Sequence, residues 1–375
     1  MIPHRSPDTI VVGGGVIGCG IAHELAKRGI HVLLLEKDLL GSGASYASAG
    51  MLAPLSDTGE LPAVQELGAE AFKMYPRFLD EIEETGGMRV ECMPSGIIRA
   101  AMTEEEVPAL RELQEAADEL GLHLEWLSGD EARNVEPLIG RDVIAATLSA
   151  GEPQLSPSRL VETLRRAAAA HGAELREHAP VTALLREGDR VVGVRLADDV
   201  IYAKTVVLAM GSWSCFASQW LGLDLPIYPV RGQVVYVNKL RQPLRHTVMR
   251  GLSYATPKGD GTTLLGTTLE HAGFDTRVTV AGVASIFSGI QSLLPAFGDT
   301  TINHTRAGLR PWSKDAMPVL GPAPGIDGVV IAAGHYRSGV LLTPITARMI
   351  ADVITEGEKS VELGPLSAAR LGRNS

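Results

Sequence analysis

Residues Thr9–Gly18 read TIVVGGGVIG, and this stretch decides the fold. The β-branched run Thr9–Val12 predicts a short, fully buried parallel strand. Val16–Arg28 places apolar residues at helical spacing, and Gly29 ends that predicted helix. His31–Leu35 predicts a second buried strand. Strand, glycine turn, helix and strand together predict a compact βαβ unit.

The glycines of the turn follow the pattern G-x-G-x-x-G of a dinucleotide-binding fingerprint. In that pattern Gly13 permits the tight turn, Gly15 lets the backbone approach a pyrophosphate, and Gly18 lets the helix pack closely on the strand. Val16 and Ile17 begin the helix, where backbone N–H groups and the positive end of the helix dipole face phosphate oxygens. We therefore predict that a dinucleotide binds at this turn.

An acidic residue follows the second strand. Glu36 can accept hydrogen bonds from both hydroxyls of an adenosine ribose, and its charge would repel a 2′-phosphate, which disfavours NADP. Lys37, the next residue, is included in the predicted cofactor contacts. These residues leave both FAD and NAD open.

Three further features favour FAD. The chain has no second G-x-G-x-x-G, so electrons would come from the substrate and not from a separately bound nicotinamide. Lys204–Trp213 predicts a buried strand that ends at Gly211, in a turn that packs beside the cofactor. Gly334–Gly339 joins a buried strand to an apolar helix, whose N-terminus would stabilise negative charge on a reduced flavin.

Composition and charge exclude several classes of protein. The 375-residue chain has a net charge of −10, which argues against nucleic acid and anionic membranes as partners because both bind basic surfaces. Its three cysteines are far apart and form no metal-ligand pattern, so we expect no metal and a reducing compartment. No apolar segment has the length of a signal peptide or a membrane span. We expect a cytoplasmic protein.

Strand and helix patterns alternate at the start, in the middle and at the end of the chain, with antiparallel-looking strands in two insertions. We predict an α/β fold with a Rossmann-like FAD-binding domain and a second, mostly antiparallel α+β substrate domain. The FAD-binding domain is expected to comprise residues 1–88, 154–220 and 305–375. The substrate-binding domain is expected to comprise residues 89–153 and 221–304.

The sequence resembles the glycine oxidase branch of the D-amino-acid oxidase family over nearly its whole length. The resemblance is carried by VVGGGVIG (11–18), ASYASAGML (44–52), VVLAMGSWS (206–214), AGLRP (307–311) and AAGHYRSGVLL (332–342). It implies the D-amino-acid oxidase type of fold and the oxidation of an α-amino acid to the imino acid. Oxygen then reoxidises the flavin and gives hydrogen peroxide, and water releases the oxo acid with ammonia or an amine.

The resemblance also implies roles for individual residues. Arg310 matches the arginine that holds the substrate carboxylate, Tyr254 matches a tyrosine that reaches the same carboxylate, and Arg337 belongs to the loop that closes over the substrate. Ser45 and the pair Gly50–Met51 match the flavin-contacting loop. The other implied cofactor contacts are Val181, Arg310, His335, Arg337, Ser338, Gly339, Val340 and Leu341, and the implied pocket wall is Met51, Ala53 and Leu269.

The leading hypothesis is oxidation of glycine, sarcosine and small D-amino acids by hydride transfer to flavin N5, which the resemblance connects with thiamine thiazole biosynthesis. Related sarcosine oxidases anchor flavin through a cysteine near AGLRP, and this chain has none there, so we expect non-covalent FAD. The alternatives are an FAD-dependent D-amino-acid or proline dehydrogenase that passes electrons to a quinone or partner protein, a flavin-binding module, and an NAD-linked dehydrogenase. By analogy with relatives we expect a homo-oligomer, either a tetramer or a dimer.

Overall fold

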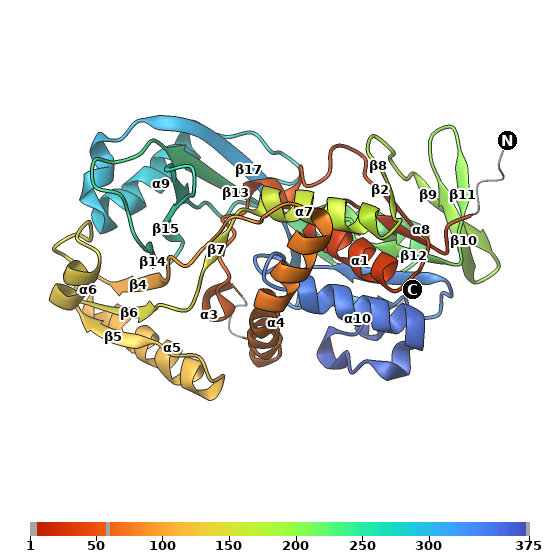
Figure 1. Ribbon diagram of the computed structural model, residues 1–375, viewed down its shortest axis with the longest axis horizontal. Helices are drawn as coiled ribbons and strands as arrows, with labels where there is room; N and C mark the ends of the chain where they lie inside the picture. Colours follow the sequence, from red (N-terminus) through yellow and green to blue (C-terminus); the bar gives the residue numbers. More distant parts are fainter. Residues whose placement is uncertain (1–5, 58–60, 373–375) are drawn as a thin grey trace.

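The computed structural model describes residues 6–57 and 61–372. Two large sheets lie side by side (Figure 1), with the sheet that carries the dinucleotide turn on the right of the view. In spatial order this six-stranded sheet consists of β18 (Val319–Pro322), β19 (Val329–Ala333), β12 (Thr205–Leu208), β1 (Thr9–Val12), β2 (Val32–Leu35) and β8 (Glu174–Arg176). All neighbours pair in parallel except the edge strand β18, which is antiparallel to β19.

The six-stranded sheet is covered on both faces, which explains why its strands are continuously apolar. Val11 and Leu34 point into a core shared with a layer of four helices. These helices are α1 (Val16–Lys27), α4 (Pro62–Gly86), α7 (Pro157–Ala170) and α10 (Thr343–Glu356). Ile10 and Leu33 point to the opposite face, because successive side chains alternate along a strand. That face packs against the antiparallel sheet of β9 (Ala183–Glu187), β10 (Arg190–Arg195) and β11 (Val200–Tyr202).

The second large sheet has eight strands and lies on the left of Figure 1. In spatial order it consists of β17 (Ile302–Ser313), β13 (Ile227–Val237), β16 (Thr263–Gly266), β15 (Ser253–Pro257), β14 (Thr247–Arg250), β4 (Ile97–Ala101), β6 (Ala145–Ser149) and β5 (Glu125–Ser128). Every neighbouring pair is antiparallel except β14 and β4. One face packs on α9 (Val280–Leu293), and the other carries a small core that includes Met51 and Tyr254.

The remaining elements are short or connect the two sheets. The α-helices are α2 (Ala44–Ala47), α3 (Pro54–Asp57), α5 (Val107–Glu119), α6 (Gly129–Val135) and α8 (Ala217–Leu221). The 3-10 helices are η1 (Glu104–Glu106), η2 (Gly211–Phe216), η3 (Pro295–Asp299), η4 (Glu358–Ser360), η5 (Gly364–Leu366) and η6 (Ala368–Arg370). A two-stranded sheet joins β3 (Cys92–Met93) to β7 (Gln154–Leu155).

This architecture confirms the predicted α/β fold class with its second, mostly antiparallel sheet. β17 crosses the predicted domain boundary at residue 305 and pairs along its length with β13 of the eight-stranded sheet. The C-terminal helix begins at Thr343, several residues after Gly339, because a turn occupies the residues between them. Among the described residues, no helix combines the length and the apolar character that a membrane span requires.

Candidate functional site

A cavity of about 770 Å³ lies between the two large sheets. It extends from the glycine turn after β1 to the strand β17 of the eight-stranded sheet. Predicted site residues that line it are Gly13, Gly15, Val16, Ile17, Glu36, Lys37, Ser45, Gly50, Met51, Val181, Gly211, Tyr254, Arg310, His335, Arg337, Gly339 and Val340. The structure therefore brings predicted site residues from eight separate stretches of sequence to a single cavity.

Five predicted site residues do not line this cavity: Gly18, Ala53, Leu269, Ser338 and Leu341. Leu269, predicted in the pocket wall, is 41% exposed in the structure. The chain pairs with β13 immediately afterwards, and this pairing directs Leu269 to solvent. Ala53 is buried in the core behind Met51, so it supports the wall without forming its surface. Ser338 and Leu341 are also buried.

The glycine turn has the shape that a phosphate-binding turn needs. Gly13 has a φ of +108°, and a Cβ at this position would lie 2.4 Å from the carbonyl oxygen of Ala209. A Cβ on Gly18 would lie 1.8 Å from the carbonyl oxygen of Gly13, so α1 packs directly on the turn. The position of Gly15 is open, since the nearest atom to a Cβ there would be Ser45 Oγ at 3.6 Å. The backbone at Gly15 is therefore exposed to the cavity, where a pyrophosphate can approach.

Glu36, the acidic residue after β2, lies at the same end of the cavity as the glycine turn. The Glu36 carboxylate accepts hydrogen bonds from the backbone N–H of Gly14 at 2.7 Å and from that of Asp38 at 2.9 Å. These two bonds orient a carboxylate at the cavity wall, where ribose hydroxyls can donate to it. The ammonium of Lys37 lies 4.5 Å from the ring centroid of Trp213, another lining residue. The groups present fit the adenosine and pyrophosphate parts of FAD.

A cationic group and a phenol occupy the opposite end of the cavity. Arg310 of β17 donates hydrogen bonds to Thr267 Oγ1 at 2.8 Å and to the carbonyl oxygen of Thr268 at 3.1 Å. Tyr254 of β15 is 5% exposed, and its ring lies over Gly266 of the neighbouring strand. Both side chains project from the same face of the eight-stranded sheet into the cavity. A guanidinium and a phenol hydroxyl in this arrangement can bind a carboxylate.

The loop before α10 closes the cavity on a third side. His335 is buried, and its Nε2 lies 3.1 Å from Thr346 Oγ1. Burial lowers the pKa of His335 to about 4, so its imidazole is neutral at pH 7. The Ser338 hydroxyl donates to the carbonyl oxygen of His335 at 2.9 Å, which fixes the turn that carries Arg337. The loop thus contributes backbone, a neutral ring and one arginine to the site.

Sequence reasoning missed several lining residues from the eight-stranded sheet and its loops. Thr267 binds Arg310, and Gly232 lies directly beneath the Arg310 guanidinium. Phe274 reaches across to the FAD-side residue Trp213, with ring centroids 5.6 Å apart. No motif marks these positions. The register of β13 against β16 and β17 brings Gly232 and Thr267 to the cavity, and the loop after β16 brings Phe274.

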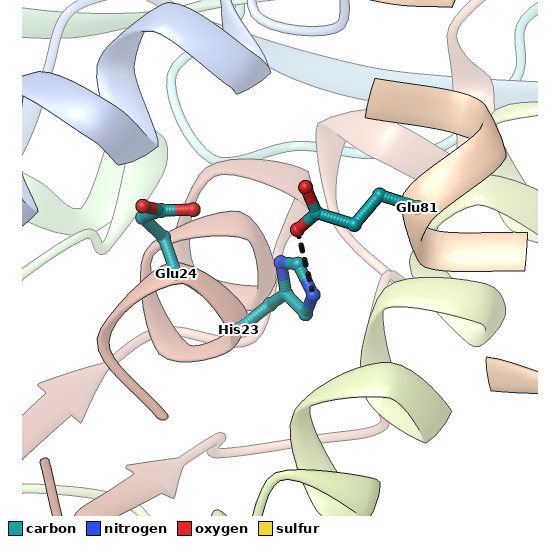
Figure 2. Close-up of side chains that lie close together, drawn as sticks. All are labelled: His23, Glu24 and Glu81. Atoms are coloured by element: carbon teal, nitrogen blue, oxygen red, sulfur yellow. Dashed lines mark ion pairs between the residues drawn. The ribbon is translucent and has the colours of Figure 1, made fainter. Parts of the chain in front are cut away.

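A separate cluster of His23, Glu24 and Glu81 has potential metal ligands (Figure 2). The His23 Nε2 lies 3.8 Å from a Glu81 oxygen. Lys27, however, places its ammonium 2.7 Å from an oxygen of each glutamate. Arg28 also places its guanidinium 2.9 Å from a Glu24 oxygen, so two cations balance the two carboxylates and the cluster is an ion-pair network between α1 and α4.

Comparison with known proteins decides between FAD and NAD. The model of the family of FAD dependent oxidoreductases (DAO) matches residues 8–353. The chain belongs to this family. FAD is therefore its cofactor, and the predicted resemblance to glycine oxidases is confirmed by the relatives below.

The relatives cover almost all of the chain. A glycine oxidase from Geobacillus kaustophilus is 33% identical over 365 residues, which are 97% of this chain and 97% of the relative. The crystal structure of glycine oxidase from the same organism superposes with a TM-score of 0.92 and covers 97% of this chain and 98% of that one. A bifunctional protein ThiO/ThiG from Trichormus variabilis is 33% identical over 353 residues, which are 93% of this chain and 53% of the relative.

Proposed function

We propose that this flavoprotein oxidises glycine, sarcosine and small D-amino acids to the oxo acid, ammonia or an amine, and hydrogen peroxide. One observation carries the proposal: Arg310 and Tyr254 lie on the same cavity as the dinucleotide turn. Relatives named glycine oxidase, at 33% identity over nearly the full length, support the same substrate class.

In this proposal Arg310 and Tyr254 hold the substrate by its carboxylate. A planar guanidinium can donate two parallel hydrogen bonds to a carboxylate, which fixes both the position and the rotation of the substrate. Tyr254 can donate a further hydrogen bond from a buried position, where water competes little. FAD supplies the hydride acceptor, at N5 of its ring, when it is bound. The protein contributes the orientation of the Cα–H bond, which such a reaction needs most.

The other residues of the cavity are assigned to binding the cofactor and to closing the site. We propose that Gly13, Gly15, Val16, Ile17 and Glu36 bind the dinucleotide part of FAD. The proposed contacts of the remaining cofactor are Lys37, Ser45, Gly50, Met51, Val181, Gly211, His335, Gly339 and Val340, all of which line the cavity. Arg337 is proposed to close over the substrate. Non-covalent binding agrees with the absence of cysteine in the AGLRP stretch.

The proposed domains keep the boundaries that are expected from the sequence. We propose that residues 1–88, 154–220 and 305–375 form the FAD-binding domain, and that residues 89–153 and 221–304 form the substrate-binding domain. The strand β17 connects the two, since it pairs with β13 at the edge of the eight-stranded sheet while Arg310 faces the cavity. The site would then lie at the junction of the domains.

The proposal also covers the pathway, the cellular location and the oligomeric state of the protein. The similarity to a ThiO/ThiG protein supports a role in thiamine thiazole biosynthesis. We further propose a cytoplasmic homo-oligomer, with oxygen as the second substrate. Size-exclusion chromatography with light scattering would test the oligomeric state.

A peroxide-coupled screen tests the substrate class. The purified yellow protein would be assayed with glycine, sarcosine, D-alanine, D-proline and a set of L-amino acids. The proposal predicts peroxide in stoichiometric amounts from glycine and from sarcosine, D-alanine or both. Turnover only with an artificial dye, without peroxide, would identify the protein as a dehydrogenase that passes electrons to a quinone or a partner protein. Turnover confined to L-amino acids would overturn the proposed substrate class.

A further inference from the structure

Two glycines lie under the groups that bind the substrate in the proposed function. A Cβ on Gly232 of β13 would lie 2.3 Å from each terminal nitrogen of Arg310. A Cβ on Gly266 of β16 would lie 2.2 Å from Cζ and 2.4 Å from the hydroxyl oxygen of Tyr254. Neither glycine has a left-handed φ, so a positive φ is not what requires glycine at these positions. What explains them is the space that the guanidinium and the phenol occupy.

A hydroxyl fixes the guanidinium from the side. Thr267 Oγ1 accepts a hydrogen bond from Arg310 at 2.8 Å and donates one to the carbonyl oxygen of Gln233 at 3.0 Å. Gln233 is itself fully buried, and its side chain is held by Glu270 and Thr279. The absence of a side chain at Gly232 thus leaves room for the guanidinium. The hydrogen bond to Thr267, which is bonded in turn to the buried Gln233, fixes its position.

We propose that Gly232, Gly266 and Thr267 are positioning residues, which set the distance between the substrate carboxylate and the groups that bind it. The inference rests on the proposed function, because it takes Arg310 and Tyr254 as the carboxylate-binding groups. It adds residues that never touch the substrate carboxylate but decide whether the substrate can be held in a reactive position.

The size of the effect follows from the contact distances. Ordinary van der Waals contact begins near 3.4 Å, so a methyl group on Gly232 displaces the guanidinium by about 1 Å. The guanidinium is the far end of a flexible side chain, so it can move without disturbing the strand. Gly232→Ala should therefore leave folding intact and impair substrate binding. A displacement of about 1 Å can cost up to about 100-fold in a reaction that depends on orientation.

The experiment compares Gly232→Ala and Gly266→Ala with the matched control Gly151→Ala. Gly151 lies in an exposed turn, has no left-handed φ, and has no atom within 4 Å of a Cβ. For both variants we expect the KM for glycine to rise by about tenfold to 100-fold at unchanged FAD content, and for Gly232→Ala, whose neighbour is the flexible end of Arg310, we also expect an unchanged Tm. The Kd of acetate, measured from the visible spectrum of the flavin, should rise in parallel. Gly151→Ala should match the wild type in all four quantities.

Two further variants distinguish a positioning role from a structural one. Thr267→Val keeps the shape but removes the hydroxyl, and it should raise KM, whereas Thr267→Ser should restore it. In an Arg310→Ala background, Gly232→Ala should have no further effect, because the group that it displaces is gone.

Each outcome decides one point. If Arg310→Ala raises the KM for glycine but Gly232→Ala and Thr267→Val behave like the control, the inference is wrong and the proposed function stands. If Gly232→Ala raises KM equally with and without Arg310, its effect is structural and the inference is also wrong. If Arg310→Ala leaves KM unchanged, the proposed function itself fails.

Discussion

Adding a single methyl group at Gly15 separates cofactor binding from folding. Gly15 has a φ of −73° and a ψ of −178°, which alanine adopts without strain, and the nearest atom to its Cβ would be 3.6 Å away. Gly15→Ala should therefore change the stability of the apoprotein by less than about 1 kcal/mol, because alanine restricts the unfolded chain but is a poorer N-cap residue than glycine.

The same methyl group would project into the cavity where the pyrophosphate must approach. Each charge-assisted hydrogen bond that the phosphate loses costs about 1.5–3 kcal/mol. One lost bond corresponds to a rise of roughly 10-fold to 150-fold in the Kd of FAD. Gly18→Ala makes a contrasting control, since its Cβ would lie 1.8 Å from a backbone oxygen that cannot move aside. That variant should be destabilised by about 1–3 kcal/mol or more even without FAD.

The assay has two parts. Urea denaturation of the apoproteins measures the free energy of unfolding, and titration of each apoprotein with FAD, followed by quenching of flavin fluorescence, measures Kd. The reasoning is refuted if Gly15→Ala binds FAD with the wild-type Kd, or if it is destabilised as much as Gly18→Ala.

Three further predictions follow from the site and the core. Arg310→Ala should raise the KM for glycine by at least about 30-fold, since a desolvated charge-assisted contact is worth about 2–5 kcal/mol; steady-state kinetics would show a wild-type KM if the assigned role is wrong. Ser45→Ala removes the hydroxyl that accepts the Val16 N–H at 3.1 Å, so the Kd of FAD should rise severalfold, for about 1 kcal/mol, while a Kd equal to that of the wild type would contradict this. Burial lowers the pKa of His23 from 6.5 to about 4, so the unfolded chain binds a proton there first as the pH falls; stability should drop by roughly 2–3 kcal/mol between pH 6.5 and pH 4, and urea midpoints across this range should fall less steeply for His23→Leu.

The dinucleotide turn could be predicted from sequence because its physics is local. Gly13, Gly15 and Gly18 act through contacts within a strand, a turn and the first turn of a helix, and the structure shows the predicted geometry at each. The continuous apolar runs likewise predicted β1 and β2 to within a residue of their observed bounds.

Gly232 and Thr267, which contact the Arg310 guanidinium, could not be predicted from local sequence in the same way. Gly232 and Arg310 are far apart in sequence, and only the antiparallel register of β13 with β17 places one beneath the other. Thr267 comes from a third strand end, and nothing in its sequence neighbourhood distinguishes it from Thr268. The exposure of Leu269 likewise depends on the pairing of Glu270 with Arg231 of β13, which the sequence does not reveal.

Anaerobic addition of glycine to the purified yellow protein tests whether the bound flavin accepts electrons from this substrate. We expect glycine to bleach the visible absorption of the flavin, and oxygen to restore it with one hydrogen peroxide formed per glycine consumed. We also expect Arg310→Ala to retain the colour but to require far more glycine for the same bleaching. A wild-type protein that holds FAD and stays yellow under glycine, sarcosine and D-alanine alike would show that the proposed reaction is wrong.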